Sequence, residues 1–168
     1  MSRLDSFIRR LKAQRVCLNL AAELVRGLDG PVLELGLGNG RTYDHLRQLF
    51  PERNIFVCER HLAAHPGCIP PSKFLLLGDM RETLPAARAW LVGQVALAHL
   101  DPGSGDVTAS QALAAALAPL ILPLLRPGAV LVSEPAIDCP RLAALALPEG
   151  VMPGRYHLYR RISCRSSA

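Results

Sequence analysis

Three glycines that alternate with other residues form the part of this sequence best suited to holding a ligand. Gly36, Gly38 and Gly40 follow the apolar, strand-favouring residues 32–35, and a helix is expected to begin near Arg41. Glycine adopts positive φ and lets a bulky ligand approach the backbone, while a helix start offers unpaired N–H groups to an anionic or polar group. Such a turn after the first strand of an α/β sheet is typical of a site for a nucleotide-like ligand. The alternative is a tight turn that binds no ligand.

A carboxylate expected at the end of the second strand could hold a ribose. Glu59 ends the apolar residues 54–59 and lies 19 residues after Gly40. In nucleotide-binding βαβ units, an acid about 20 residues beyond the glycines accepts hydrogen bonds from ribose hydroxyls. One carboxylate can accept from two neighbouring hydroxyls, although a solvated charge at a strand end would leave the same pattern.

The spacing of the glycines narrows the range of possible ligands. A dinucleotide fingerprint, G-x-G-x-x-G, needs its third glycine where this chain has Arg41, and no P-loop pattern occurs. The run from Glu34 to Gly40 instead resembles the E/D-x-G-x-G-x-G signature of class I S-adenosylmethionine-dependent methyltransferases. Residues 125–132 are similar to a second element of that family, L-x-P-G-G-x-L-x-x, with Ala129 in place of one glycine. The resemblance implies S-adenosyl-L-methionine as the cofactor.

The resemblance also implies roles for the side chains at the strand ends. Glu34 is expected near the methionine ammonium, directly or through water, and Glu59 at the ribose. Asp79 would accept from the adenine amino group while Met80 packs on the base, and Asp79 could also cap a helix over residues 81–90. The expected cofactor contacts are Glu34, Gly36, Leu37, Gly38, Gly40, Thr42, Glu59, Arg60, Asp79, Met80 and His99.

Two residues at the end of the expected fourth strand are candidates for catalysis. His99 and Asp101 end residues 95–101, and ligands of open α/β sheets lie beyond the ends of strands one and four, where the strand order reverses. His99 could act as a general base, because the histidine pKa lies near neutrality, or as a structural hydrogen-bonding group. Asp101 could take a proton or orient an amino or hydroxyl nucleophile.

The expected methyl acceptor is a small molecule, with a peptide-borne nucleophile as the alternative. Enzymes of this fold that methylate a nucleobase amino group carry an aromatic residue shortly after the acid, whereas residues 103–104 are glycine and serine here, which argues against a flipped base. The net charge of +5 would suit a nucleic-acid partner, but the basic residues are spread along the chain. A non-catalytic domain that binds S-adenosylmethionine and a nicotinamide-dependent oxidoreductase are the alternatives, and the position of the third glycine argues against the second.

These side chains need a sheet whose strand ends meet at one edge. Apolar runs that alternate with helical patterns predict one α/β domain over residues 1–168, with a doubly wound, mostly parallel Rossmann-like sheet of six or seven strands and an added N-terminal helix. Residues 1–30 would form that helix, residues 31–133 the cofactor-binding core, over which the resemblance extends, and residues 134–168 a short C-terminal part. There we expect a helix over residues 138–147 and a last strand, with its antiparallel neighbour missing or very short.

Composition bounds the class of protein and its location. Half of the residues are hydrophobic, which indicates a globular chain. No apolar run reaches the length of a membrane span and the N-terminus lacks the apolar core of a signal peptide, so we expect a cytoplasmic protein that does not bind membranes. Five cysteines without a C-x-x-C pair predict neither a disulfide framework nor a metal site. The N-terminal helix and the apolar residues 113–125 are candidate surfaces for a homo-oligomer.

Overall fold

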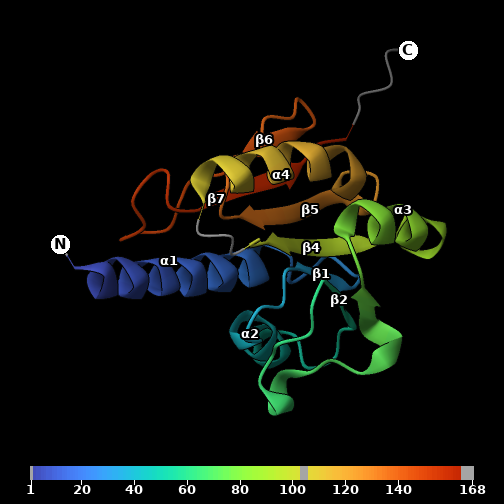
Figure 1. The fold of residues 1–168 in the computed structure, drawn as a ribbon. Coiled ribbons are helices and arrows are strands. Elements are labelled where there is room, and N and C mark those ends of the chain that lie inside the picture. Colours follow the sequence, from blue (N-terminus) through green and yellow to red (C-terminus); the bar gives the residue numbers. More distant parts are fainter. Residues whose placement is uncertain (1, 103–105, 164–168) are drawn as a thin grey trace.

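The computed structural model of the chain describes residues 2–102 and 106–163 (Figure 1). Residues 103–104, whose small side chains disfavour a flipped base as substrate, lie outside the described residues, as does one of the five cysteines, Cys164. The helices are α1 (Arg3–Leu24), α2 (Arg41–Leu49), α3 (Met80–Leu91) and α4 (Val107–Ile121), with two short 3-10 helices, η1 (Pro66–Cys68) and η2 (Ser72–Phe74). Among the described residues, no helix combines the length and the apolar character needed to cross a membrane.

Within residues 2–102 and 106–163, seven strands form a single sheet in the order β3-β2-β1-β4-β5-β7-β6. The strands are β1 (Val32–Leu35), β2 (Ile55–Glu59), β3 (Leu75–Leu77), β4 (Val95–Leu100), β5 (Leu125–Ser133), β6 (Leu142–Ala144) and β7 (His157–Arg161). Strands β1 to β5 are parallel, whereas β7 runs antiparallel to both β5 and β6. The strand order reverses between β1 and β4, which confirms the predicted doubly wound, mostly parallel sheet with an added N-terminal helix.

The C-terminal part differs from its prediction in one element. Residues 138–147, predicted as a helix, contain β6 instead, and Ala144 of β6 pairs with Tyr159 of β7. Pairing with a neighbouring strand outweighs the helix propensity of alanine and leucine here. Both final antiparallel strands are therefore present, and β6 is as short as the sequence suggested.

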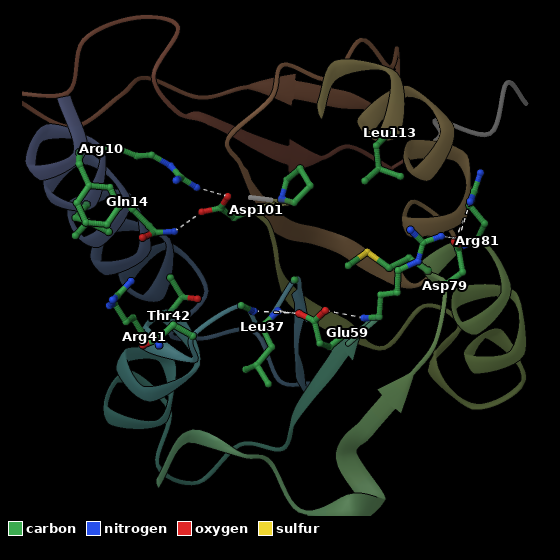
Figure 2. A pocket seen from close by; sticks show the side chains of 18 residues that line it. Arg10, Gln14, Leu37, Arg41, Thr42, Glu59, Asp79, Arg81, Asp101 and Leu113 are labelled. Carbon is green, nitrogen blue, oxygen red and sulfur yellow. Dashed lines mark hydrogen bonds and ion pairs between the residues drawn. The ribbon is translucent and has the colours of Figure 1, made fainter. Parts of the chain in front are cut away.

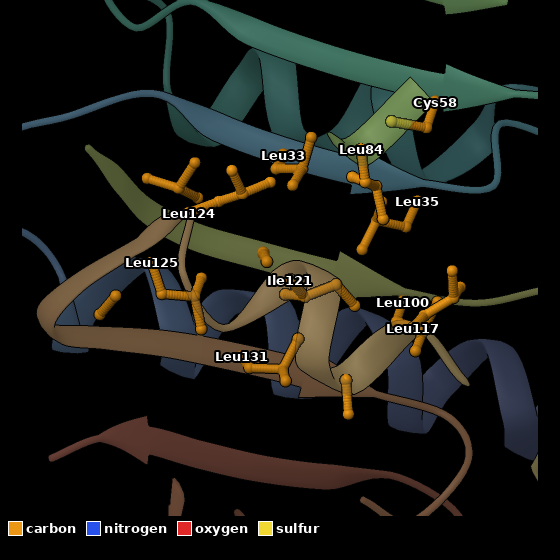
Figure 3. Close-up of a cluster of buried hydrophobic side chains, with 14 of the residues drawn as sticks. Leu33, Leu35, Cys58, Leu84, Leu100, Leu117, Ile121, Leu124, Leu125 and Leu131 are labelled. Carbon is orange, nitrogen blue, oxygen red and sulfur yellow. The ribbon is translucent and has the colours of Figure 1, made fainter. Parts of the chain in front are cut away.

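Helices cover both faces of the sheet (Figure 1). On one face α4 packs Leu117 and Ile121 in a buried cluster with Leu33 of β1 (Figure 3). On the other face α1 and α2 contribute Leu18 and Leu46 to a second buried cluster. Strands β1 and β4 are buried along their whole length, as expected for central parallel strands that are covered on both sides.

The two segments predicted as oligomer surfaces differ in exposure. Within residues 113–125, side chains such as Leu117 are buried in the core, so this segment leaves little apolar surface for another subunit. The first turns of α1 do leave apolar side chains in solvent, because Leu4, Phe7 and Ile8 are between 40% and 65% exposed. A homo-oligomer through α1 stays a prediction.

A buried ion pair joins the two central strands. Glu34 of β1 and His99 of β4 are register partners, and Nδ1 of His99 lies 2.7 Å from Oε2 of Glu34. Both side chains are fully buried. Burial alone would lower the pKa of His99, but the charge of Glu34 and its hydrogen bond outweigh burial and raise this pKa above its ordinary value. The pair therefore stabilises a protonated histidine inside the core.

We expect the contribution of His99 to stability to depend on pH. Because the pKa of His99 is raised in the folded state, its stabilising effect is fully present below about pH 6.5, the ordinary histidine pKa, and is lost as the pH rises through the folded pKa. The substitution His99→Gln should lower the free energy of unfolding by about 1–3 kcal/mol at about pH 6, and by less at about pH 9. Urea denaturation of both proteins measures the difference, and a difference independent of pH would contradict the ionic state assigned to the pair.

Candidate active site

A cavity of about 570 Å³ opens at the carboxyl ends of the parallel strands (Figure 2). This volume lies within the range of about 300–1,000 Å³ that is usual for small-molecule sites. The predicted site residues that line it are Gly36, Leu37, Gly38, Thr42, Glu59, Arg60, Asp79, Met80 and Asp101. Three other predicted residues, Glu34, Gly40 and His99, do not line it. Helix α1 and Leu113 of α4 complete the wall.

The glycines after β1 serve two purposes. Gly36 has φ of +103°, and a Cβ there would lie 2.4 Å from the carbonyl oxygen of Asp101. Gly40 has φ of +87°, and its Cβ would lie 2.4 Å from the Cβ of Cys68. A Cβ on Gly38 would meet no heavy atom within 4 Å. Gly36 and Gly40 are therefore required by the protein's own packing, whereas Gly38 borders open space where a ligand can approach the backbone.

Helix α2 begins at the edge of this cavity. Its N-cap, Gly40, supplies no side-chain hydrogen bond, so backbone N–H groups and the positive end of the helix dipole are available to an anionic group. Arg41 and Thr42 of the first turn both line the cavity. In the part of the chain that the structure describes, His, Cys, Asp and Glu form no cluster suited to a metal ion.

Glu59, at the end of β2, holds the glycine turn in place. One oxygen of its carboxylate accepts the backbone N–H groups of Leu37 at 2.7 Å and Gly38 at 3.0 Å. The other accepts those of Arg60 at 2.7 Å and His61 at 3.0 Å. Burial raises the pKa of Glu59, but the backbone hydrogen bonds outweigh burial and bring this pKa below its ordinary value. Ribose hydroxyls would therefore have to share this carboxylate with backbone donors or displace them.

Asp79 begins α3 and is held by two arginines. Its side chain accepts the backbone N–H of Arg81, which confirms Asp79 as the helix N-cap. The carboxylate also lies 2.6 Å from Nη2 of Arg81 and 2.9 Å from Nη2 of Arg60. The side-chain hydrogen bond from Arg81 is the main reason that the pKa of Asp79 lies well below its ordinary value. The contact with adenine stays a prediction, and an amino group there would compete with two guanidinium groups.

Glu34 and His99 lie beneath the cavity and not in its wall. Both are fully buried, and the two oxygens of Glu34 accept from the Thr42 hydroxyl and from His99. Glu34 was expected near the methionine ammonium, directly or through water, and its full burial leaves no direct contact with a ligand in the cavity. His99, predicted as a general base or as a structural hydrogen-bonding group, is enclosed by protein, with Glu34 at Nδ1 and Tyr156 at Nε2. The pair instead fixes Thr42 at the start of α2.

Asp101, just after β4, is the centre of a second set of hydrogen bonds. Nη2 of Arg10 and Nε2 of Gln14, both from α1, donate to its carboxylate at 2.5 Å and 2.6 Å. The hydroxyl of Tyr156 donates at 3.0 Å. The side chains of Arg10 and Asp101 are only 29% and 10% exposed, so solvent screens this ion pair little. These bonds fix α1 to the end of β4 beside the cavity (Figure 2).

Arg10, Gln14 and Tyr156 are polar residues of the site that the sequence analysis did not identify. Arg10 and Gln14 are four residues apart and therefore share one face of α1, but their partner lies 91 and 87 residues away along the chain. Gln14 is buried among apolar residues of that helix. A glutamine at a core position was the signal that could have pointed to a buried polar partner.

Comparison with known proteins identifies the family. A family model described as S-adenosyl-L-methionine methyltransferase matches residues 1–161. The crystal structure of an S-adenosyl-L-methionine methyl transferase from Silicibacter pomeroyi DSS-3 is 46% identical to this chain, with a TM-score of 0.92 over 96% of this chain and 99% of that one. Human methyltransferase-like protein 13 in complex with SAH shares the fold at 15% identity, with a TM-score of 0.59 over 92% of this chain and 83% of that one. Comparison with curated proteins finds no match.

The family match extends over nearly the whole sequence, and it agrees with the glycine turn and the strand-end carboxylates that surround one cavity. Membership makes S-adenosyl-L-methionine the cofactor and methyl transfer the reaction. The chain belongs to the S-adenosyl-L-methionine methyltransferase family.

Proposed function

We propose that this methyltransferase binds S-adenosyl-L-methionine across the ends of β1, β2 and β3 and methylates a small molecule that enters beside α1. One observation carries the proposal: a single cavity brings together the open backbone at Gly38, the carboxylate of Glu59, and Met80. These groups follow one another along the sheet edge in the order needed for methionine, ribose and adenine. The predicted contacts that line the cavity could therefore be made by one bound cofactor.

The methionine end of the cofactor would lie over the glycine turn. Its carboxylate would bind at the start of α2, where Gly40 leaves the helix without a side-chain cap. Gly38 would allow the cofactor to lie against the backbone, since a Cβ there would project into open space. Glu34 would act indirectly, because it holds Thr42 at the edge of the cavity.

The adenosyl end would lie over the ends of β2 and β3. Its ribose hydroxyls would donate to Glu59, whose lowered pKa keeps it a carboxylate. The adenine would pack on Met80, with its amino group near Asp79. Arg60 and Arg81, which now hold Asp79, would border the base.

When bound, S-adenosyl-L-methionine supplies a methyl group on a sulfonium, which is a good leaving group. Positioning of two reactants can then supply most of the acceleration. Asp101 would orient an amino or hydroxyl nucleophile, and the proton of that nucleophile would pass to Asp101 or to water. Phe7, Leu11 and Leu113 line the cavity with apolar surface for the acceptor. A small-molecule acceptor fits this wall, while residence in the cytoplasm stays a prediction.

The role of Glu59 can be tested through binding. The substitution Glu59→Ala should weaken binding of S-adenosyl-L-methionine by about 1–3 kcal/mol, because both the ribose acceptor and the anchor of the turn are lost. Isothermal titration calorimetry measures the affinity, and thermal denaturation checks that the variant folds. Glu52→Ala, an exposed acid in the loop between α2 and β2, is the control that should keep the wild-type affinity. Unchanged affinity in Glu59→Ala would remove Glu59 from the cofactor site.

Gly38→Ala tests whether the open backbone faces the cofactor. Gly38 has φ of +51° and Gly93, between α3 and β4, has φ of +66°, and a Cβ meets no atom within 4 Å at either position. Alanine at each should therefore destabilise the fold by a similar amount, about 1–2 kcal/mol. Only Gly38→Ala should weaken cofactor binding, by about tenfold or more. Equal affinities in the two variants would contradict the proposed position of the methionine.

A further inference from the structure

Tyr156 lies between the two polar residues near the end of β4. Its hydroxyl is 3.0 Å from Oδ2 of Asp101 and 3.5 Å from Nε2 of His99. Its ring stacks on the His99 ring, with centroids 6.1 Å apart. Tyr156 is fully buried, so its hydroxyl depends on these protein partners. It thereby connects Asp101, which lines the cavity, to His99, which does not.

The Tyr156 hydroxyl has one hydrogen to donate. The protonation state of His99 determines whether Asp101 alone, or also Nε2 of His99, can accept it. Nδ1 of His99 lies 2.7 Å from Glu34 and carries a hydrogen, because a carboxylate can only accept. In the imidazolium, Nε2 also carries a hydrogen and faces the oxygen of Tyr156, which leaves the hydroxyl hydrogen for Asp101. In the neutral imidazole, Nε2 is an acceptor and competes with Asp101 for that hydrogen.

We propose that Tyr156 is a positioning residue that couples the proton on His99 to the Asp101 carboxylate beside the reaction site. With His99 protonated, Asp101 accepts from Arg10, Gln14 and Tyr156. With His99 neutral, the hydroxyl turns towards Nε2, and Asp101 gains a free lone pair for the nucleophile or the sulfonium. This inference rests on the proposed function, in which Asp101 orients the nucleophile that attacks the methyl group of the sulfonium.

The surrounding charges give the direction of the effect. The titratable and charged groups around His99 are Glu34 of β1, Asp101 at the end of β4, Arg10 of α1 and Tyr156 before β7. Beyond them Glu134, which follows β5, interacts electrostatically with Asp101, Arg10 and Arg155. When His99 loses its proton, this group of side chains becomes more negative by one charge. The change favours the cationic sulfonium of S-adenosyl-L-methionine over the neutral thioether of S-adenosylhomocysteine.

The preference between these two ligands is therefore the readout. Calorimetry of wild type with each ligand, from about pH 6 to about pH 9, should show the preference for S-adenosyl-L-methionine rising about three- to tenfold as His99 loses its proton. Tyr156→Phe keeps the ring and the titration of His99 but removes the hydroxyl, so its preference should rise clearly less than that of the wild type over the same range. The amino groups of the free ligands titrate alike in every experiment, so comparison between variants removes their contribution.

Two further variants complete the comparison. Tyr159→Phe is the matched control, because the Tyr159 hydroxyl accepts the backbone N–H of Ile137 outside this network, and it should reproduce the wild-type rise. His99→Gln removes the titrating group and should give a flat profile. A wild-type preference that does not change with pH would overturn the proposal. An equal rise in Tyr156→Phe would also overturn it, since direct charge interaction would then suffice.

A measurement on the ligand-free wild type keeps the test decisive if Tyr156→Phe does not fold. The chain has three tyrosines, so protein labelled with ¹³C-tyrosine gives few NMR signals. The spectra of Tyr43→Phe and Tyr159→Phe each lack one of them, which identifies the signal of Tyr156. The Tyr156 signal should shift with the same midpoint as the ring nitrogens of His99, and different midpoints would overturn the coupling. Coupled midpoints together with unchanged affinity in Glu59→Ala would instead contradict the proposed cofactor position and leave the hydrogen-bond coupling intact.

Discussion

The buried pair of Glu34 and His99 is the interaction on which the functional edge of the sheet depends. Two charges inside a protein cost several kcal/mol each in lost hydration unless they face each other with good geometry. Here they do so because β1 and β4 are neighbours with these residues in register. A slip of one residue would leave the two side chains on opposite faces of the sheet. The pair therefore favours one register and, through Thr42, one position for the start of α2.

Each carboxylate of the cavity wall already accepts hydrogen bonds from donors of the protein itself. Backbone N–H groups surround Glu59, arginines surround Asp79, and α1 with Tyr156 surrounds Asp101. These bonds hold each acid in place before a ligand arrives, so little order has to be created on binding. A ligand must replace or share the existing bonds, and one that lacks matching donors leaves a charged acceptor less well satisfied. The same bonds thus favour both a fixed site and a selective one.

The features of the site that could be predicted from the sequence are those that a short local pattern of residues both forms and makes suited to a ligand. The alternation of Gly36, Gly38 and Gly40 after an apolar strand predicted the turn, and the distance to Glu59 predicted the neighbouring strand end correctly. Family membership also contradicts the nicotinamide-dependent alternative, as the glycine spacing had indicated. The roles of Glu34 and His99 were less accessible, because a strand pattern predicts that a residue lies near the site but not whether it faces the cavity or the core.

The remaining errors come from contacts between distant parts of the chain. The helix expected over residues 138–147 failed because pairing with β7 outweighs local propensity there. The contacts of Arg10 and Tyr156 with Asp101 join residues 91 and 55 positions apart. The local periodicity of hydrophobic residues does not predict contacts between residues so far apart. A buried glutamine at Gln14 and a tyrosine directly before an alternating strand become informative only when a partner is known.

The two halves of helix α1 have different roles, since one packs in the core and the other lines the cavity. Its second half packs in the core from Ala13 onward, while Phe7, Arg10 and Leu11 of its first half line the cavity. Because Asp101 binds Arg10 and Gln14, this helix is a fixed wall and not a free flap. The cofactor would be recognised by backbone and carboxylates at the strand ends, and the acceptor by side chains of α1 and α4. A fold can therefore retain its cofactor while substitutions on two helices change what is methylated.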